Sequence, residues 1–185
     1  DTIPEVDVED VGASIYRDDE EGGVTAVDSV PISTKDLFGP ESGLTILFGL
    51  PGAFTPTCSD IHVPGFVDLA PKFKELGVET IACTSANDRF VLSAWNETLN
   101  KCMEKPNSDI KLLADADNEL AQRLGMRDDL GFGLGVRTKR FALLMENGVV
   151  QWLATDEGMD VCEYTSAKAL LKYLMPEAAL EESNA

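Results

Sequence analysis

The residue with the clearest chemical potential in this sequence is Cys58. The apolar run 44–50 predicts a buried strand, which Pro51-Gly52 would end, and Thr57 is a residue type that suits a helix cap. Cys58 would then lie in the first turn of a helix, where unpaired N–H groups and the helix dipole stabilise a thiolate. Because the thiolate is the reactive form of cysteine, this placement favours a nucleophile over an inert core thiol.

Residues around and beyond Cys58 resemble peroxiredoxins. Pro51, Thr55 and Cys58 match the Pro-x-x-x-Thr-x-x-Cys signature of that family. The longer segment 51–66 is similar to its type II, atypical two-cysteine members. Further similarity lies in two downstream segments, 82–88 and 134–141. The resemblance implies a homodimeric thiol peroxidase that reduces hydrogen peroxide and small alkyl hydroperoxides.

The resemblance also assigns roles to the residues around the thiol. Reduction of a peroxide needs a thiolate, donors that orient the peroxide, and positive charge as the O–O bond breaks. Thr55 can bring a hydroxyl beside the sulfur that both donates and accepts, and Pro51 would shield the pocket from water. Arg137 is predicted to be the cation that keeps Cys58 ionised. Arg140 competes for this role, and we expect it instead at the surface or in an outer layer.

His62 is the single histidine of the chain and permits a different chemistry. It follows Cys58 by four residues, so one helical face could carry both side chains. A Cys–His acyl-transfer enzyme, which forms a thioester, is therefore an alternative. No acidic partner for His62 is identifiable, and a positioning or packing role is expected. No second ligand pair has zinc spacing and no phosphate loop occurs, so neither a metal nor a cofactor is predicted.

Two cysteines could recycle the sulfenic acid that Cys58 would form. By resemblance, Cys83 matches the resolving cysteine of plant type II members, whereas Cys162 lies near the position used by animal atypical two-cysteine members. Cys83 is predicted within a central strand and Cys162 in a loop that moves more easily. We predict that Cys162 resolves faster if an internal disulfide forms. Glutathione, glutaredoxin or thioredoxin would otherwise supply the electrons. A redox relay or holdase chaperone on the same fold is the non-enzymatic alternative.

Composition and charge limit the partners and the location. The net charge of −18 argues against a nucleic-acid or anionic-membrane surface, which would need clustered Lys and Arg. No apolar run approaches the length of a membrane span. Four cysteines in 185 residues do not make a secreted disulfide scaffold. A soluble intracellular protein is expected, in the cytoplasm or in an organelle after removal of a presequence.

The order of predicted elements indicates an α/β fold with a mixed central sheet flanked by helices, compatible with the thioredoxin-like fold that the resemblance implies. Besides the first strand and the Cys58 helix, which Pro64-Gly65 should interrupt, we predict strands at 78–85 and 110–114, helices at 89–101, 118–124 and 165–175, and a hairpin of 138–146 with 149–154. An N-terminal β-hairpin extension would pair 11–17 with 24–27. The chain divides into an acidic N-terminal segment, 1–23, the thioredoxin-like domain, 24–176, and an acidic tail, 177–185.

Overall fold

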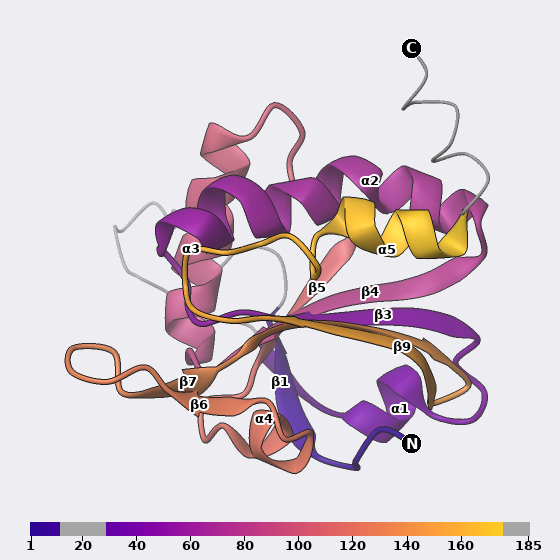
Figure 1. The fold of residues 1–185 in the computed structure, drawn as a ribbon, viewed down its shortest axis with the longest axis horizontal. Coiled ribbons are helices and arrows are strands. Elements are labelled where there is room, and N and C mark those ends of the chain that lie inside the picture. The colour runs from indigo at the N-terminus through magenta and orange to yellow at the C-terminus, as the bar shows by residue number, and fades with distance from the viewer. Residues whose placement is uncertain (12–28, 176–185) are drawn as a thin grey trace, which may run out of the picture.

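A mixed β-sheet runs through the centre of the molecule (Figure 1). The computed structural model describes residues 1–11 and 29–175, and within them seven strands join in the order β2-β1-β5-β4-β3-β8-β9. These strands are β1 (Asp7–Val11), β2 (Ser29–Ser33), β3 (Leu44–Gly49), β4 (Val78–Ser85), β5 (Ile110–Ala114), β8 (Arg140–Glu146) and β9 (Val149–Asp156). Strands β3, β4 and β5 are mutually parallel, and the outer pairings are antiparallel.

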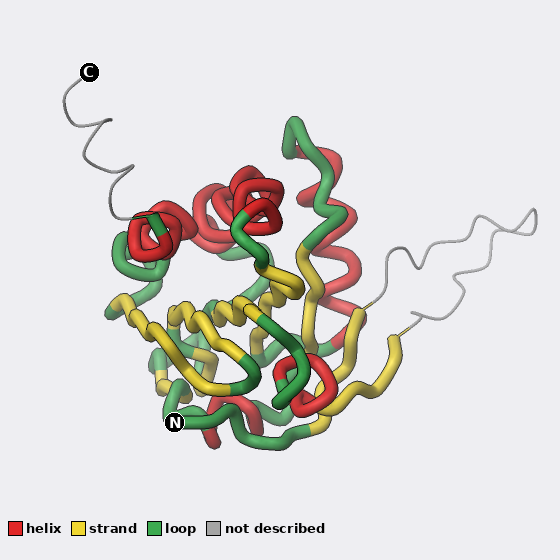
Figure 2. The backbone as a smooth tube through the Cα atoms, turned by 90° about the vertical axis from the view of Figure 1, so that its right-hand side faces the viewer, coloured by secondary structure: helices red, strands yellow, loops and turns green. Residues whose placement is uncertain are grey.

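Helices cover both faces of this sheet (Figure 2). One face carries the π-helical turn η1 (Cys58–His62), α2 (Val63–Glu75), α3 (Arg89–Cys102) and α5 (Ala167–Leu174). The other face carries α1 (Thr34–Phe38) and α4 (Glu119–Arg123). A separate two-stranded sheet pairs β6 (Arg127–Asp129) with β7 (Val136–Thr138).

Strand β3 is apolar except for Thr45, and both of its faces are covered. Ile46 and Phe48 point into the core layer under α2 and α3, whereas Leu47 points into the layer under α1 and α4. All three side chains are fully buried. A strand with two buried faces has a continuous apolar run rather than an alternating pattern. The position of β3 at the centre of the sheet therefore follows from its composition.

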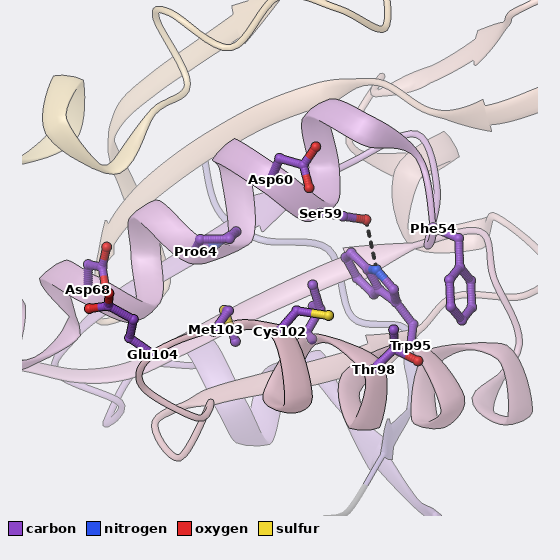
Figure 3. Close-up of a pocket in the computed structure, with 11 residues that line it drawn as sticks. Phe54, Ser59, Asp60, Pro64, Asp68, Trp95, Thr98, Cys102, Met103 and Glu104 are labelled. Carbon is purple, nitrogen blue, oxygen red and sulfur yellow. Dashed lines mark hydrogen bonds between the residues drawn. The ribbon is translucent and has the colours of Figure 1, made fainter.

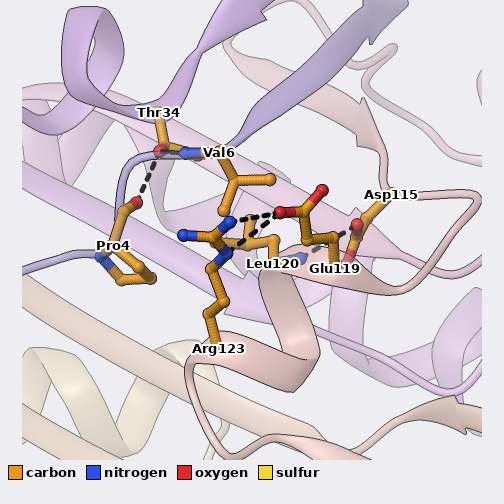
Figure 4. Close-up of polar contacts among 7 residues, drawn as sticks. All are labelled: Pro4, Val6, Thr34, Asp115, Glu119, Leu120 and Arg123. Carbon is orange, nitrogen blue, oxygen red and sulfur yellow. Dashed lines mark hydrogen bonds and ion pairs between the residues drawn. The ribbon is translucent and has the colours of Figure 1, made fainter.

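Buried polar side chains attach the peripheral elements to the core (Figure 4). The Thr34 hydroxyl accepts a hydrogen bond from the Val6 N–H at 2.9 Å and donates to the Pro4 carbonyl at 2.7 Å. The Asp115 carboxylate accepts from the N–H groups of Leu120 and Ala121, which lie in the first turn of α4. Burial raises the pKa of Asp115 although these hydrogen bonds oppose the shift. Thr34 and Asp115 are thus buried polar side chains whose hydrogen bonds are made inside the fold.

Most predicted elements are confirmed, several of them residue for residue. The strands at 78–85 and 110–114 have the predicted bounds, and helices occur close to 89–101 and 118–124. The predicted hairpin is present with its Asn147-Gly148 turn, where both residues have positive φ.

Other predictions were wrong in detail. Residues 136–138 belong to the separate β6–β7 sheet, so the hairpin begins at Arg140. Helix α5 spans Ala167–Leu174 and so begins later than the predicted range 165–175, because Ser166 caps it with an Oγ that accepts from the Ala169 N–H. The N-terminal hairpin joins the main sheet, because β1 pairs with β5 as well as with β2. Apart from Val11, which belongs to β1, the expected strands 11–17 and 24–27, the boundary at residue 24 and the tail 177–185 lie outside the described residues.

Candidate active site

Cys58 lies between the central strand β3 and the helix α2 that follows it in the chain. Strand β3 ends at Gly49, a loop follows, and Cys58 begins the π-helical turn η1, as the sequence predicts for a helix start. The thiol has no solvent exposure. The predicted interruption at Pro64-Gly65 falls earlier in the structure: the irregular turn is η1 itself, and Pro64 lies in the first turn of α2. π-helical turns are rare and occur frequently at functional sites.

The cation beside the sulfur is Arg140. Its Nη1 donates to Cys58 Sγ at 3.3 Å, and its Nη2 donates to the Met159 carbonyl at 2.7 Å. Arg140 is 1% exposed, so the expectation of a surface position was wrong. The physical reason is the strand register. Phe141 pairs with Gly49, the last residue of β3, so Arg140 lies just beyond the end of β3. The Arg140 side chain is on the same face of β8 as that of Ala142, and Ala142 packs in the same core layer as Cys58.

Arg137, the predicted cation, lies nearby but contacts a different group. Its Nε donates to the Leu134 carbonyl at 2.9 Å, from strand β7 of the small sheet. Its Nη1 lies close to Gly52 of the active-site loop: a Cβ atom added to Gly52 would be 3.3 Å from Arg137 Nη1. Arg137 therefore packs against the loop, while the direct contact with the sulfur comes from Arg140.

The loop between β3 and η1 has a defined conformation. The Thr55 hydroxyl donates to the Gly52 carbonyl at 2.8 Å, and the Ala53 N–H donates to Asn87 Oδ1 at 2.8 Å. Phe54 adopts a positive φ of 62°, which is uncommon for a residue with a side chain. Pro51 is buried. The structure thus places Pro51, Thr55 and Cys58 on one short segment, with the Thr55 hydroxyl bonded to backbone in this state.

His62 contacts the arginine and not the sulfur. Its Nδ1 lies 3.0 Å from Arg140 Nη1, and its Nε2 lies 3.2 Å from the Thr165 carbonyl oxygen. Because a guanidinium can only donate, Nδ1 is the acceptor and Nε2 carries the proton that is donated to Thr165. Burial, and then the charge of Arg140, lower the pKa of His62 from 6.5 to about 3. Neither nitrogen of this neutral ring is free to take a proton from Cys58, so the geometry does not support a Cys–His dyad.

Comparison with known proteins identifies the family of this chain. The Redoxin family model matches residues 13–171. Peroxiredoxin-2D of Arabidopsis thaliana is 39% identical over 165 residues, which cover 82% of this chain and 98% of that protein. The chain belongs to the peroxiredoxin family. The resemblance to type II peroxiredoxins is thus confirmed, and as a member of this family the chain is a thiol-dependent peroxidase.

Other peroxiredoxins are similar in sequence or structure. Peroxiredoxin-2E-2, chloroplastic, of Oryza sativa subsp. japonica is 42% identical over 80% of this chain and 71% of its own length. The hybrid peroxiredoxin hyPrx5 of Haemophilus influenzae is 38% identical over 83% of this chain, which spans only 62% of that protein. Reduced Prx3 of Vibrio vulnificus in complex with H2O2 superposes with a TM-score of 0.76 at 33% identity, over 94% of this chain and 96% of the other. The predicted thioredoxin-like fold is confirmed.

The other three cysteines of this peroxiredoxin differ in their surroundings, and all four are free thiols. Cys83 is buried in β4 opposite Phe48, and burial raises its pKa well above the usual value. Cys162 lies in the loop after β9, with its sulfur 3.9 Å from Thr165 Oγ1, and burial raises its pKa as well. Cys102 is exposed at the end of α3. The predicted strand and loop positions of the two resolving candidates are therefore correct.

A pocket of about 550 Å³ lies next to the Cys58 helix but does not include the thiol (Figure 3). It separates η1 and α2 from α3, and Ser59, Trp95 and Cys102 are among the residues that line it. The Trp95 Nε1–H donates to Ser59 Oγ at 3.0 Å, which ties α3 to the residue that follows Cys58.

Within residues 1–11 and 29–175, no three His, Cys, Asp or Glu side chains are arranged to hold a metal ion. No helix in that part of the chain is long and apolar enough to cross a membrane.

Arg140→Met is expected to slow the reaction of Cys58 with hydrogen peroxide by about 10²–10³-fold, because it removes the charge that faces the sulfur. The ultraviolet absorbance of the thiolate should also appear at higher pH in this variant. Arg137→Met is the matched control and should change both quantities much less. An equal or larger effect of Arg137→Met would contradict the assignment of Arg140.

Acidification is expected to destabilise the protein through His62. The ring stays neutral in the fold down to about pH 3, whereas the unfolded chain binds a proton near pH 6.5. Between these values the unfolded state holds more protons, so the free energy of unfolding decreases as the pH falls, by up to about 1.4 kcal/mol per pH unit. His62→Gln should remove this contribution. Denaturant unfolding of both proteins from about pH 6.5 to pH 4.5 measures it, and parallel slopes would disprove it.

Proposed function

We propose that Cys58 is the residue that attacks the peroxide in this thiol peroxidase. The observation that carries the proposal is the 3.3 Å contact between the buried sulfur and Arg140. The thiolate attacks one peroxide oxygen, an S–O bond forms and the O–O bond breaks. The second oxygen leaves with the bonding electron pair and takes up a proton, as water or an alcohol. Cys58 is left as a sulfenic acid.

Neighbouring groups would stabilise this step. Arg140 faces the sulfur with a charge that its other hydrogen-bond partners, the His62 ring and the Met159 carbonyl, do not neutralise. We assign Thr55 to the peroxide itself, because its hydroxyl can accept a hydrogen bond while it donates to Gly52. Buried Pro51 would keep water from the reacting atoms. The similarity to a Vibrio vulnificus peroxiredoxin solved with H2O2 supports hydrogen peroxide as a substrate.

For recycling we propose that Cys162 attacks the Cys58 sulfenic acid, which releases water and forms a disulfide. Cys162 lies in a loop, whereas Cys83 lies in a strand with partners on both sides. Movement of Cys83 would break the hydrogen bonds of three strands. Glutathione, glutaredoxin or thioredoxin would then reduce the disulfide, or would reduce the sulfenic acid directly.

These thiol donors belong to reducing compartments, so we propose that the protein is located in the cytoplasm or in an organelle. Imaging of a tagged full-length protein would test this location.

We also propose a homodimer that forms beside the active-site loop. Three phenyl side chains are unusually exposed for apolar groups: Phe54 in that loop and Phe90 at the start of α3 are 54% exposed, and Phe132 is fully exposed. The hydrogen bond from Ala53 to Asn87 joins the segment that carries Phe54 to the one that precedes Phe90, and neighbouring exposed apolar groups commonly mark protein contacts. Sedimentation at micromolar concentration should give a dimer mass, and a monomer mass would contradict the proposal.

Cys58→Ser should abolish peroxide reduction with every thiol donor, because serine is not ionised at neutral pH. Cys102→Ser should retain it, because Cys102 is exposed at the far end of α3. Peroxide consumption with glutathione–glutaredoxin or with thioredoxin is the measurement. Comparable turnover by Cys58→Ser would refute the mechanism. Oxidation of Cys58 without turnover would indicate a redox relay instead.

Mass spectrometry of peptides from peroxide-treated protein, without added thiol, should find Cys58 linked to Cys162. A disulfide needs its α-carbons within about 4.4 to 6.8 Å, and a loop can reach this distance at a lower structural cost than a central strand. Cys83→Ser serves as the control and should leave the linkage intact. A dominant Cys58–Cys83 disulfide would overturn the choice of Cys162.

A further inference from the structure

One buried carboxylate holds the loop that carries Cys162. Asp156 is the last residue of β9 and is 4% exposed. Its two oxygens accept four hydrogen bonds: from the N–H groups of Glu163, Tyr164 and Thr165 at 3.0, 3.1 and 3.0 Å, and from the Thr165 hydroxyl at 2.7 Å. The carboxylate therefore closes the loop 157–165 onto the end of the strand from which it starts.

The same loop contacts the Cys58 site at two points. The Met159 carbonyl accepts from Arg140 Nη2 at 2.7 Å, and the Thr165 carbonyl lies 3.2 Å from His62 Nε2. Figure 1 shows this segment running between β9 and α5 beside the start of the helix that follows Cys58. A continuous chain of contacts thus leads from the sulfur through Arg140 and His62 to the loop.

Arg140 depends on this loop for its orientation. Its acceptors in the described part of the chain are Cys58 Sγ, His62 Nδ1 and the Met159 carbonyl, and its buried Nε has no partner there. Met159 belongs to the loop, and the His62 ring is fixed by the loop residue Thr165. If the loop opened, Arg140 would lose the Met159 carbonyl as an acceptor. The His62 ring, its second acceptor, would lose the Thr165 contact that fixes the orientation of the ring.

We propose that Asp156 is a positioning residue that acts on Cys58 through the loop 157–165. With the loop closed, Arg140 is held against the sulfur and the thiolate is stabilised for attack on the peroxide. Opening the loop frees Cys162 and at the same time loosens the arginine. The inference rests on the proposed role of Cys58, and it adds that one loop governs both the peroxide step and the availability of the resolving thiol.

The charge of Asp156 is suited to this task. Burial by itself would raise its pKa, but the hydrogen bonds from the Thr165 hydroxyl and from the three N–H groups outweigh burial and lower it. The ionised carboxylate accepts all four hydrogen bonds without donating any. An asparagine keeps one acceptor oxygen, and its NH2 group would face either the Tyr164 N–H or the N–H groups of Glu163 and Thr165. Asp156→Asn should therefore weaken the attachment of the loop at little cost in volume.

The test compares Asp156→Asn with Asp160→Asn, an exposed residue of the same loop whose replacement removes the same charge. For Asp156→Asn we expect thiolate absorbance to appear at higher pH and the peroxide rate constant to fall about tenfold to a hundredfold. Cys162 should be alkylated faster by iodoacetamide, as measured on its peptide. Asp160→Asn should match wild type in all three measurements. A role in stability alone would lower the unfolding midpoint and leave the thiolate titration unchanged.

If the two variants give the same thiolate titration and peroxide rate, the inference is wrong. Thr165→Val provides a second variant in case Asp156→Asn does not fold, because it keeps the backbone N–H and carbonyl and removes the 2.7 Å hydrogen bond to Asp156 together with the 3.9 Å contact to Cys162 Sγ. It should shift the same measurements in the same direction by a smaller amount, and no shift would also overturn the inference. Turnover that survives Cys58→Ser refutes the proposed function itself, which is a distinguishable outcome.

Discussion

A guanidinium buried against a thiol is the interaction on which the rest of this site depends. Burial of an unpaired charge is costly, and the acceptors of Arg140 other than the sulfur are neutral, namely a histidine ring and a carbonyl. Within the described residues, the sulfur of Cys58 is thus the one hydrogen-bond partner of Arg140 that can carry negative charge. Ionisation of the thiol completes a buried ion pair. A carboxylate in place of His62 would compete for the same charge, so a permanently neutral ring fits this position.

The register of the sheet brings Cys58 and Arg140 together from distant parts of the sequence. Strand β3 leads into the Cys58 loop, and β8 pairs with β3 so that Arg140 lies at the same end of the sheet. The fully buried faces of β3 fix that register, because a slip by one residue would turn Phe48 and Leu47 into the wrong core layers. Packing of an apolar core thereby sets the distance between a charged group and a thiol that are 82 residues apart in the sequence.

The sequence predicts the elements and the position of Cys58 well because their signals are local. Apolar runs locate the central strands, and a strand, a Pro-Gly break and a helix start locate Cys58. The arginine depends on pairing between strands, which spacing along the chain does not reveal. Had 137–146 been one strand, Arg137 and Arg140 would have faced opposite sides, and the chain in fact changes sheets between Thr138 and Arg140. Asp156 had no distinguishing pattern among 33 acidic residues, since its role appears only when the loop folds back.

The two resolving candidates also differ in what holds them in place. Cys83 sits in a strand whose neighbours on both sides belong to the apolar core, so its movement would cost both packing and hydrogen bonds. Residues 157–164 contribute to neither apolar cluster of the described chain, and Val161 and Tyr164 are exposed. Polar contacts such as those of Asp156 hold this loop, and when it opens water can take up these hydrogen bonds, so each costs less than its strength in the absence of water. A catalytic cycle that must expose and then recover a thiol requires such a segment, because packed apolar structure does not open locally without a large free-energy cost.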